Sequence, residues 1–381
     1  MNFELDEELR QYRDSVIAFA QKELNDDVVT RDAEVAFSRE GWRKCADFGI
    51  QGLPVPLKYG GQGASASTII VAMEALGYGC RDAGLIFSMN AQMWGCTTPL
   101  LRAGSEEQKR RYLPALCRGS IIGAHAMTEP GSGSDAFALS TSATRSGDSY
   151  MLNGSKTFVS NAPVADLFVT FATIDRSLGF AGLCAFLVDR DAPGLVIGKP
   201  LAKMGLRTSP MSEVVFEGCR IPATALLGRE GGGMALFATA MDWERSCILA
   251  GALGTMQRQL ERSLDYARDR KQFGQPIGKF QAVSHRLVDM KLRLETSRLL
   301  LQRLGWLMDR GKATPLDSAL AKLHVSESFA RSSLDALATF GGYGYMAEYE
   351  IEREVRDALG SRIYSGTSDI QKNIAAAFLG L

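Results

Sequence analysis

Apolar residues recur at helical spacing at the start of the chain. They follow one another at intervals of three or four residues, which places them on one face of a helix. A further helix is indicated by Ser105 and Gln108, whose spacing is that of a capping box. The pattern predicts a helical region over residues 1–120. Its first apolar face consists of Leu5, Leu9, Tyr12, Val16 and Phe19.

The pattern changes after residue 120, where strand-like runs bounded by Gly or Pro replace helical spacing. Asn153-Gly154, inside the first run, is typical of the two-residue turn of a β-hairpin. We expect a β domain over residues 121–232. The runs are YMLNGSKTFVS (150–160), DLFVTFAT (166–173), LCAFLVD (183–189) and EVVFEGCRI (213–221).

Helical spacing returns after Gly233. Two long apolar stripes follow, one beginning at Ile248 and the other at Val283. Long amphipathic segments of this kind are typical of a four-helix bundle, which we expect over residues 233–381. The fold class expected is mainly α with a central β domain.

Composition excludes several classes of function. The 381 residues include 43 Lys plus Arg and 43 Asp plus Glu, so there is no net basic field to hold nucleic acid. No apolar run approaches the roughly 20 residues of a membrane-spanning helix. The seven cysteines include no CxxC pair and the N-terminus has no signal pattern, which predicts free thiols and a cytoplasmic protein. The three histidines are far apart, so we expect no metal site.

Four segments combine side chains that could carry chemistry, although each has a simpler structural interpretation. MTEPGSGSD (127–135) could bring backbone N–H groups to a ligand, or be a polar loop. KTFVSN (156–161) puts an aromatic and a hydroxyl on one strand face, as a flat heterocycle requires, or is a half-buried strand. MDWERS (241–246) offers a carboxylate base among apolar residues, or the acidic start of a helix. RDALGSRIYSGTSDIQ (356–371) could present N–H groups to an anion, or be a helix cap.

Five segments, in their order and spacing, resemble motifs of the acyl-CoA dehydrogenase family. They are TEPGSGSD, KTFVSN, RKQFGQPIG (270–278), FGGYGY (340–345) and YSGTSDIQ (364–371), and the resemblance covers essentially the whole chain. It implies an N-terminal helical domain, a middle β-barrel and a C-terminal four-helix bundle. It also implies FAD between the β domain and the bundle, completed by a neighbouring subunit of a homo-oligomer that is usually a tetramer.

The resemblance assigns cofactor contacts to individual residues. Those expected around the flavin lie in the first two motifs: Met127, Thr128, Ser134, Phe158 and Ser160. Arg270 and Phe273 are expected to hold the pyrophosphate of the neighbouring subunit's FAD, since a guanidinium suits a diphosphate.

The remaining cofactor contacts are assigned to the last two motifs. Those expected along the adenosine and near the final turn are Gly341, Gly342, Gly344, Thr367 and Asp369. Many members carry a glutamine where this chain has Ala338, so one contact to FAD is expected to be missing or replaced.

The position of the base departs from the common pattern of the family. Most members carry the catalytic glutamate immediately before the Gly-Thr of the last motif, where this chain has Ser365. A minority, isovaleryl-type enzymes among them, carry it one residue before an arginine on an earlier helix, which is the position of Glu244. The resemblance implies that Glu244 removes the α-proton of a thioester. It places Asp242 and Arg245 at the pantetheine arm of the substrate.

Several stretches are similar to L-prolyl-carrier-protein dehydrogenases of pyrrole and pyrroline natural-product pathways. They are SNAPVADLFVTFAT (160–173), DWERSCILAGALG (242–254), QAVSHRLVDMKLRLETSRLLL (281–301) and RIYSGTSDIQ (362–371). This similarity implies a prolyl group on the phosphopantetheine arm of a carrier protein, oxidised to a pyrroline or pyrrole thioester. Trp243, Tyr364 and Ser365 would line a pocket suited to a short ring.

Two other functions stay open at this point. One is a conventional short- or branched-chain acyl-CoA dehydrogenase, which would act on a CoA thioester. The other is a non-catalytic helical binding protein with the same fold. The electron acceptor is also open between an electron-transfer flavoprotein and molecular oxygen.

Overall fold

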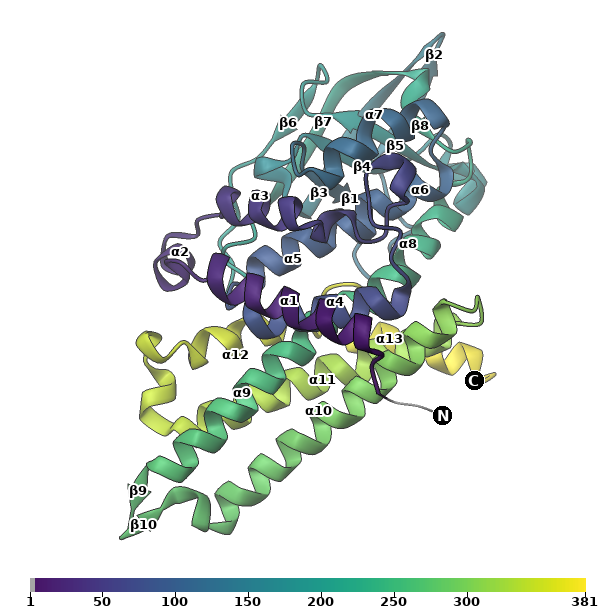
Figure 1. Ribbon diagram of the computed structural model, residues 1–381. Coiled ribbons are helices and arrows are strands. Elements are labelled where there is room, and N and C mark those ends of the chain that lie inside the picture. The colour runs from purple at the N-terminus through teal and green to yellow at the C-terminus, as the bar shows by residue number, and fades with distance from the viewer. Residues whose placement is uncertain (1–3) are drawn as a thin grey trace.

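The computed structural model describes residues 4–381, and its N-terminal part is helical as the periodicity predicts (Figure 1). Ser105 and Gln108 form the predicted capping box at the start of α7, each side chain accepting a hydrogen bond from the other's backbone N–H. The helices are α1 (Glu7–Glu23), α2 (Val28–Glu34), α3 (Arg39–Phe48), α4 (Ala66–Gly79), α5 (Ala83–Gln92), α6 (Thr98–Ala103) and α7 (Glu106–Cys117).

An eight-stranded sheet follows these helices. Its strand order is β6-β7-β3-β2-β4-β5-β8, and β1 pairs with β4 in parallel. The strands are β1 (Gly123–Ala126), β2 (Ser142–Ser146), β3 (Ser149–Ser160), β4 (Leu167–Thr173), β5 (Leu183–Asp189), β6 (Leu195–Ile197), β7 (Met211–Pro222) and β8 (Leu226–Leu227).

Strand β4 separates two apolar cores, and all of its residues are buried. Because side chains alternate along a strand, Phe168 and Ala172 pack inside the sheet domain. Val169 and Phe171 point the other way and join the cluster that contains Leu113 of α7. The sheet therefore depends on the N-terminal helices to cover one of its faces.

The hairpin turn predicted at Asn153-Gly154 is wrong. Both residues lie inside the continuous strand β3. Gly154 has a φ of 145° and marks a register shift between β3 and β7, which is a β-bulge. The side chain of Asn153 accepts a hydrogen bond from the backbone N–H of Gly218 at 2.8 Å, across to β7. The Asn-Gly pair thus stabilises a bulge between long strands instead of reversing the chain.

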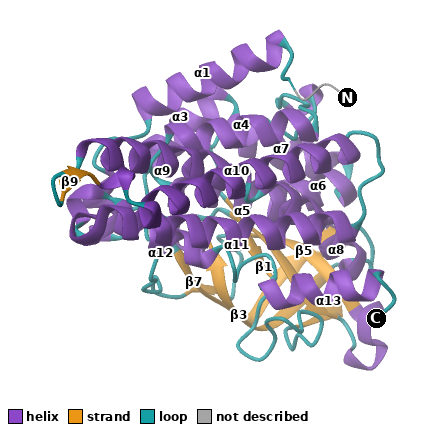
Figure 2. Cartoon of the chain, turned by 90° about the horizontal axis from the view of Figure 1, so that it is seen from below, coloured by secondary structure: helices purple, strands orange, loops and turns teal. Residues whose placement is uncertain are grey.

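The C-terminal part is again helical, so helices, sheet and helices follow in the predicted order. The small hairpin of β9 (Lys271–Gln272) and β10 (Gln275–Pro276) lies at the end of the bundle remote from the large sheet (Figure 1). Figure 2 shows the strands of the large sheet gathered on one side of the helices. The helices are α8 (Gly233–Cys247), α9 (Ala250–Asp269), α10 (Gln281–Met308), α11 (Pro315–Phe340), α12 (Ile351–Gly360) and α13 (Ser368–Phe378).

The two helical parts share one core because α4 and α9 cross at glycines. A Cβ added to Gly77 would lie 1.9 Å from the carbonyl oxygen of Gly251, and one added to Gly254 would lie 2.1 Å from that of Glu74. Only glycine permits so close an approach of two backbones. The N-terminal helices are thereby joined to the bundle in a single apolar cluster.

None of the helices within residues 4–381 is both long and apolar enough to cross a membrane. All seven cysteines are free and buried.

We predict that Gly254→Ala destabilises the fold by about 1–3 kcal/mol, the usual cost of overpacking, because the added methyl group meets the backbone of α4. Thermal unfolding followed by circular dichroism measures the effect. Gly131→Ala is the matched control, since a Cβ there has no neighbour within 4 Å. Equal melting temperatures for the two variants would contradict the role of the glycine crossing.

Candidate active site

Glu244 and Ser365 meet although 121 residues separate them in sequence. Glu244 lies near the end of α8, and Ser365 lies in the turn between α12 and α13. The Ser365 hydroxyl donates a hydrogen bond of 2.5 Å to Glu244 Oε1. No hydrogen-bond donor of residues 4–381 is paired with Oε2, so this oxygen remains free to accept a proton. The structure thus places the predicted base directly beside the residue that occupies the more common position of the base.

The turn that carries Ser365 has an unusual backbone. Ser365 has a φ of 58° and Gly366 a φ of 88°, both in the left-handed region. A non-glycine residue in this region is strained and persists only where its surroundings fix it. Because of this conformation, the two carbonyl groups of the turn are available to side chains of three helices.

Three side chains bind those carbonyl groups. The Nε2 of Gln371, on α13, donates to the carbonyl oxygens of Gly366 at 2.9 Å and Ser365 at 3.2 Å. The Nζ of Lys322, on α11, donates to that of Gly366 at 2.7 Å. The Nε of Arg245, on α8, donates to that of Ser365 at 3.3 Å. The turn is therefore fixed to the same bundle that carries Glu244.

Sequence reasoning did not identify Lys322 or Gln371. Lys322 is fully buried, on a face of α11 that it shares with Ala319, Val325 and Phe329. A lysine inside such an apolar stripe is the signal that could have pointed to it, because lysine is almost never fully buried without a partner.

Burial raises the pKa of Glu244, while the hydrogen bond from Ser365 and the positive charges of Arg245 and Lys322 oppose that rise. Burial also lowers the pKa of Lys322 to about 8, and Arg245 adds to this effect. Desolvation raises the pKa of Asp242, and Arg245 opposes it. The site therefore holds a carboxylate whose proton affinity is increased, as a general base requires.

The predicted substrate-contacting residues are chain neighbours of Glu244 on α8 or of Ser365 in the turn. The rings of Trp243 and Trp94 are stacked with centroids 6.0 Å apart, and the rings of Tyr364 and Phe87 lie 4.8 Å apart. The Arg245 side chain is 13% exposed, whereas that of Asp242 is 42% exposed, and their charged groups lie 3.9 Å apart. Asp242 is therefore the more accessible of this pair.

The MTEPGSGSD loop (127–135), which begins with Met127 and Thr128 and includes Ser134, is fixed to β3. The buried Nζ of Lys156 donates to the carbonyl oxygen of Met127 at 3.1 Å and to Glu129 Oε1 at 2.8 Å. The backbone N–H of Thr157 donates to the carbonyl oxygen of Thr128 at 2.8 Å. Glu129 and Lys156 were missed from the sequence because they support the loop without being expected to touch a ligand.

Phe158 and Ser160 follow this ion pair along β3. Phe158 is 63% exposed and has a φ of 55°, next to a register shift in the strand. A large aromatic ring held in solvent on a left-handed backbone is costly unless another group covers it. The exposed ring and the adjacent hydroxyl fit a flat, polar heterocycle.

Arg270, Gly341 and Gly342 line a cavity of about 530 Å³ at the other end of the bundle. A Cβ on either glycine would have no neighbour within 4 Å. The Arg270 guanidinium lies 5.4 Å from the ring centroid of Tyr343 and within 4.0 Å of no carboxylate of residues 4–381. Phe273, in the hairpin beside this cavity, is 93% exposed. The hairpin lies at the end of the bundle remote from α8 (Figure 1), so one chain does not bring it to the helix that carries Glu244.

Thr367 and Asp369 have local roles at the start of α13. The hydroxyl of Thr367 accepts a hydrogen bond from the backbone N–H of Ile370 at 3.2 Å, which is the N-cap of the helix. Asp369 is exposed and pairs with Lys372 at 3.1 Å. The simpler interpretation of this segment, a helix cap, is confirmed, and any contact to a cofactor would add to it.

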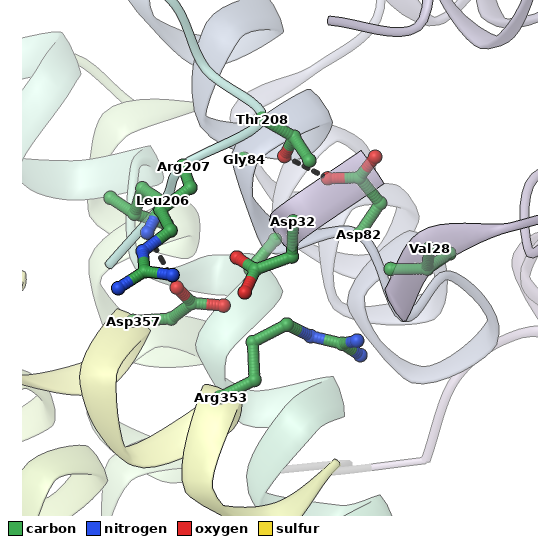
Figure 3. A pocket seen from close by; sticks show the side chains of 10 residues that line it. Val28, Asp32, Asp82, Gly84, Leu206, Arg207, Thr208, Arg353 and Asp357 are labelled. Atoms are coloured by element: carbon green, nitrogen blue, oxygen red, sulfur yellow. Dashed lines mark hydrogen bonds between the residues drawn. The ribbon is translucent and has the colours of Figure 1, made fainter. Parts of the chain in front are cut away.

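A narrow polar crevice lies between α2, α5, α12 and the loop before β7 (Figure 3). Its polar groups bind one another: the backbone N–H of Leu206 donates to Asp357 at 2.5 Å, and the Thr208 hydroxyl donates to Asp82 at 2.5 Å. Burial raises the pKa of Asp357 to about 7. The crevice joins the three parts of the chain and contains none of the predicted site residues.

Three family models match consecutive parts of the chain. They are the acyl-CoA dehydrogenase N-terminal domain over residues 6–120, the middle domain over residues 124–219 and the C-terminal domain over residues 231–380.

The chain is also similar to individual proteins over nearly its whole length. The L-prolyl-(peptidyl-carrier protein) dehydrogenase of Pseudomonas fluorescens is 46% identical over 91% of each chain. The crystal structure of the prolyl acyl carrier protein oxidase AnaB superposes with a TM-score of 0.98 at 49% identity, over 99% of this chain and 100% of that one. The structure of PigA with FAD and proline superposes with a TM-score of 0.98 at 42% identity, over all of both chains.

We predict that Ser365→Ala raises the pKa of Glu244 further, because the carboxylate loses the hydroxyl that stabilises its ionised form. Glu244 then stays protonated up to a higher pH. The protonation midpoint is measured from the carboxylic-acid stretch in infrared difference spectra, assigned by its loss in Glu244→Gln. Ser365→Gly is the matched variant, since glycine removes the hydroxyl and tolerates the left-handed backbone. A midpoint unchanged in both variants would show that the hydrogen bond does not tune the base.

Proposed function

The chain belongs to the acyl-CoA dehydrogenase family, and we propose that it is an FAD-dependent dehydrogenase of L-proline held as a thioester on a carrier protein. The observation that carries this proposal is the contact between Glu244 and Ser365, which equips the site with one carboxylate base on α8. The similarity to two prolyl-carrier-protein oxidising enzymes supports the choice of substrate.

The residues present fit FAD in three places. Phe158 and Ser160 offer an exposed ring and a hydroxyl to the flavin, beside the fixed loop of Met127, Thr128 and Ser134. Arg270 offers a guanidinium without a carboxylate partner to a diphosphate. Gly341 and Gly342 leave open space beside it, with Phe273, Thr367 and Asp369 as further proposed contacts. Bound FAD supplies the group that accepts a hydride from the substrate.

Glu244 is proposed to take the proton from the carbon next to the thioester carbonyl. Its free Oε2 is available for this proton, while Oε1 is held by Ser365. The raised pKa brings the carboxylate closer to the proton affinity that the step requires. Asp242, at the more exposed end of the site, is proposed to bind the pantetheine arm, with Arg245 behind it.

The substrate and the partners are proposed from the same geometry. Trp243 and Tyr364 are each braced by a second ring, so they form rigid walls that suit a small ring better than a flexible acyl chain. The separation of Arg270 from Glu244 in one chain supports a homo-oligomer, proposed to be a tetramer, in which a neighbouring subunit completes each cofactor site. The proposed electron acceptor is an electron-transfer flavoprotein or molecular oxygen.

We predict that Glu244→Gln keeps FAD bound and lowers turnover by about 10²–10⁴-fold or more, because an amide of the same shape cannot accept the proton. Flavin absorbance measures cofactor content, and anaerobic bleaching by substrate measures the reaction. Glu295→Gln is the matched control, because Glu295 forms ion pairs on α10 with Lys291 and Arg298. Near-wild-type bleaching by Glu244→Gln would remove Glu244 from the role of base.

We predict that prolyl-loaded carrier protein bleaches the flavin and that isovaleryl- and butyryl-CoA do not. Free L-proline and unloaded carrier protein are the controls, and product formation is followed with each proposed electron acceptor. Bleaching by the CoA thioesters alone would indicate a conventional acyl-CoA dehydrogenase. A colourless protein that takes up no FAD would indicate a non-catalytic relative.

A further inference from the structure

Lys322 is a buried cation for which the proposed reaction assigns no role. Its side chain has no exposed surface, and no carboxylate of the described residues 4–381 lies within 4.0 Å of its Nζ. Its one hydrogen bond goes to the carbonyl oxygen of Gly366 at 2.7 Å. A buried ammonium without an ion-pair partner is unfavourable unless nearby negative charge or dipoles compensate it. The compensation must therefore come from the surroundings of the turn.

The charged and titratable groups that face this part of the site come from several elements. Glu244 and Arg245 of α8 and Glu327 of α11 act on Lys322, and Arg245 opposes its charge while the two glutamates favour it. Cys96 and Tyr364 face Glu244 from other elements. Glu327 is already paired with Arg362 at 2.8 Å. Among the described residues 4–381, Glu244 has no arginine or lysine nitrogen within 4.0 Å, in contrast to Glu327.

The position of Lys322 couples two effects on Glu244. It holds Gly366, the residue that follows Ser365 in the strained turn, so it helps to fix the hydroxyl that binds Oε1. Its charge also favours the ionised form of the carboxylate across a poorly solvated interior, where charges interact more strongly than in water.

We propose that Lys322 is a positioning residue of this site, whose ammonium holds the Gly366 carbonyl so that Ser365 stays against Glu244 and whose charge stabilises the ionised carboxylate of Glu244. This inference rests on the proposed role of Glu244 as the base. With Lys322, α11 joins α8, α12 and α13 among the helices that determine the proton affinity of Glu244.

Substitution of Lys322 tests both effects in the FAD-loaded full-length enzyme. In Lys322→Met, which has a similar length and no charge, the protonation midpoint of Glu244 moves to higher pH and turnover at neutral pH falls. Turnover recovers as the pH is raised, because the carboxylate then ionises without help. Lys322→Gln retains a donor for the Gly366 carbonyl but no charge, and it shows the same direction of shift. Lys322→Arg keeps the charge and leaves the midpoint near that of the wild type.

Lys203→Met is the matched control for a general loss of stability. Lys203 also binds backbone carbonyls, those of Leu206 and Ser209, and burial also lowers its pKa to about 8. Its charge does not contribute to the pKa of Glu244. The control keeps the wild-type midpoint of Glu244, whatever its effect on the melting temperature.

The midpoint is read from the infrared carboxylic-acid band and, independently, from the acid limb of the pH profile of kcat/KM, which reports groups of the free enzyme. A midpoint in Lys322→Met and Lys322→Gln equal to that of the wild type, with Glu244→Gln inactive, overturns the inference and leaves the proposed function intact. An active Glu244→Gln overturns the proposed function first. An equal shift in Lys203→Met also overturns the inference, because the effect would then not depend on the position of the charge.

Discussion

The hydrogen bond between Ser365 and Glu244 depends on the relative placement of four helices. Glu244 is carried by α8, whereas Ser365 sits in a turn between α12 and α13, and Lys322 of α11 binds the same turn. A hydrogen bond between side chains of separate helices tolerates little displacement, because hydrogen bonds weaken steeply as geometry departs from the ideal. Helices α8, α11 and α12 contribute to one apolar cluster, which the glycine crossing of α4 and α9 extends into the N-terminal region. The packing of the whole helical part therefore determines the geometry of a single contact.

The energetics of this contact explain why the site is rich in buried polar groups. A base that is too well solvated stays ionised but has little affinity for a proton, whereas a base buried without partners becomes protonated and inactive. Glu244 lies between these limits, because burial raises its pKa while Ser365, Arg245 and Lys322 oppose the rise. A buried ammonium and a strained turn cost stability. The favourable free energy of packing in the large shared core offsets these two costs.

The sequence alone predicted the order of helices and strands, because amphipathic stripes and apolar runs reflect burial directly. Through the resemblance it related Glu244 and Ser365 as the two alternative positions of the base, but it did not predict their hydrogen bond, since nothing local relates residues so far apart. Lys322 was not found because it binds a carbonyl of a distant segment, and Gln371 was not found because its bond to Gly366 depends on the left-handed turn within its own motif. Asn153-Gly154 was misjudged because a bulge and a turn use the same residues, and only the length of the pairing strand β7 distinguishes them. The cofactor contacts of Arg270 and the glycine motif stay predictions. Within a single chain these residues lie at the end of the bundle far from α8, the helix of Glu244.

The serine at position 365 and the glutamate at position 244 have a physical explanation only as a pair. A glutamate at position 365 would bring a second carboxylate to the place where the Ser365 hydroxyl now contacts Glu244 Oε1. Two carboxylates in contact cannot both be ionised, so one would hold a proton and the charge available to act as base would be shared. A serine instead supplies a donor, which leaves one negative charge facing Lys322 and Arg245. The two cations and the hydroxyl are therefore matched to one carboxylate on α8, and each of the two positions accounts for the residue at the other.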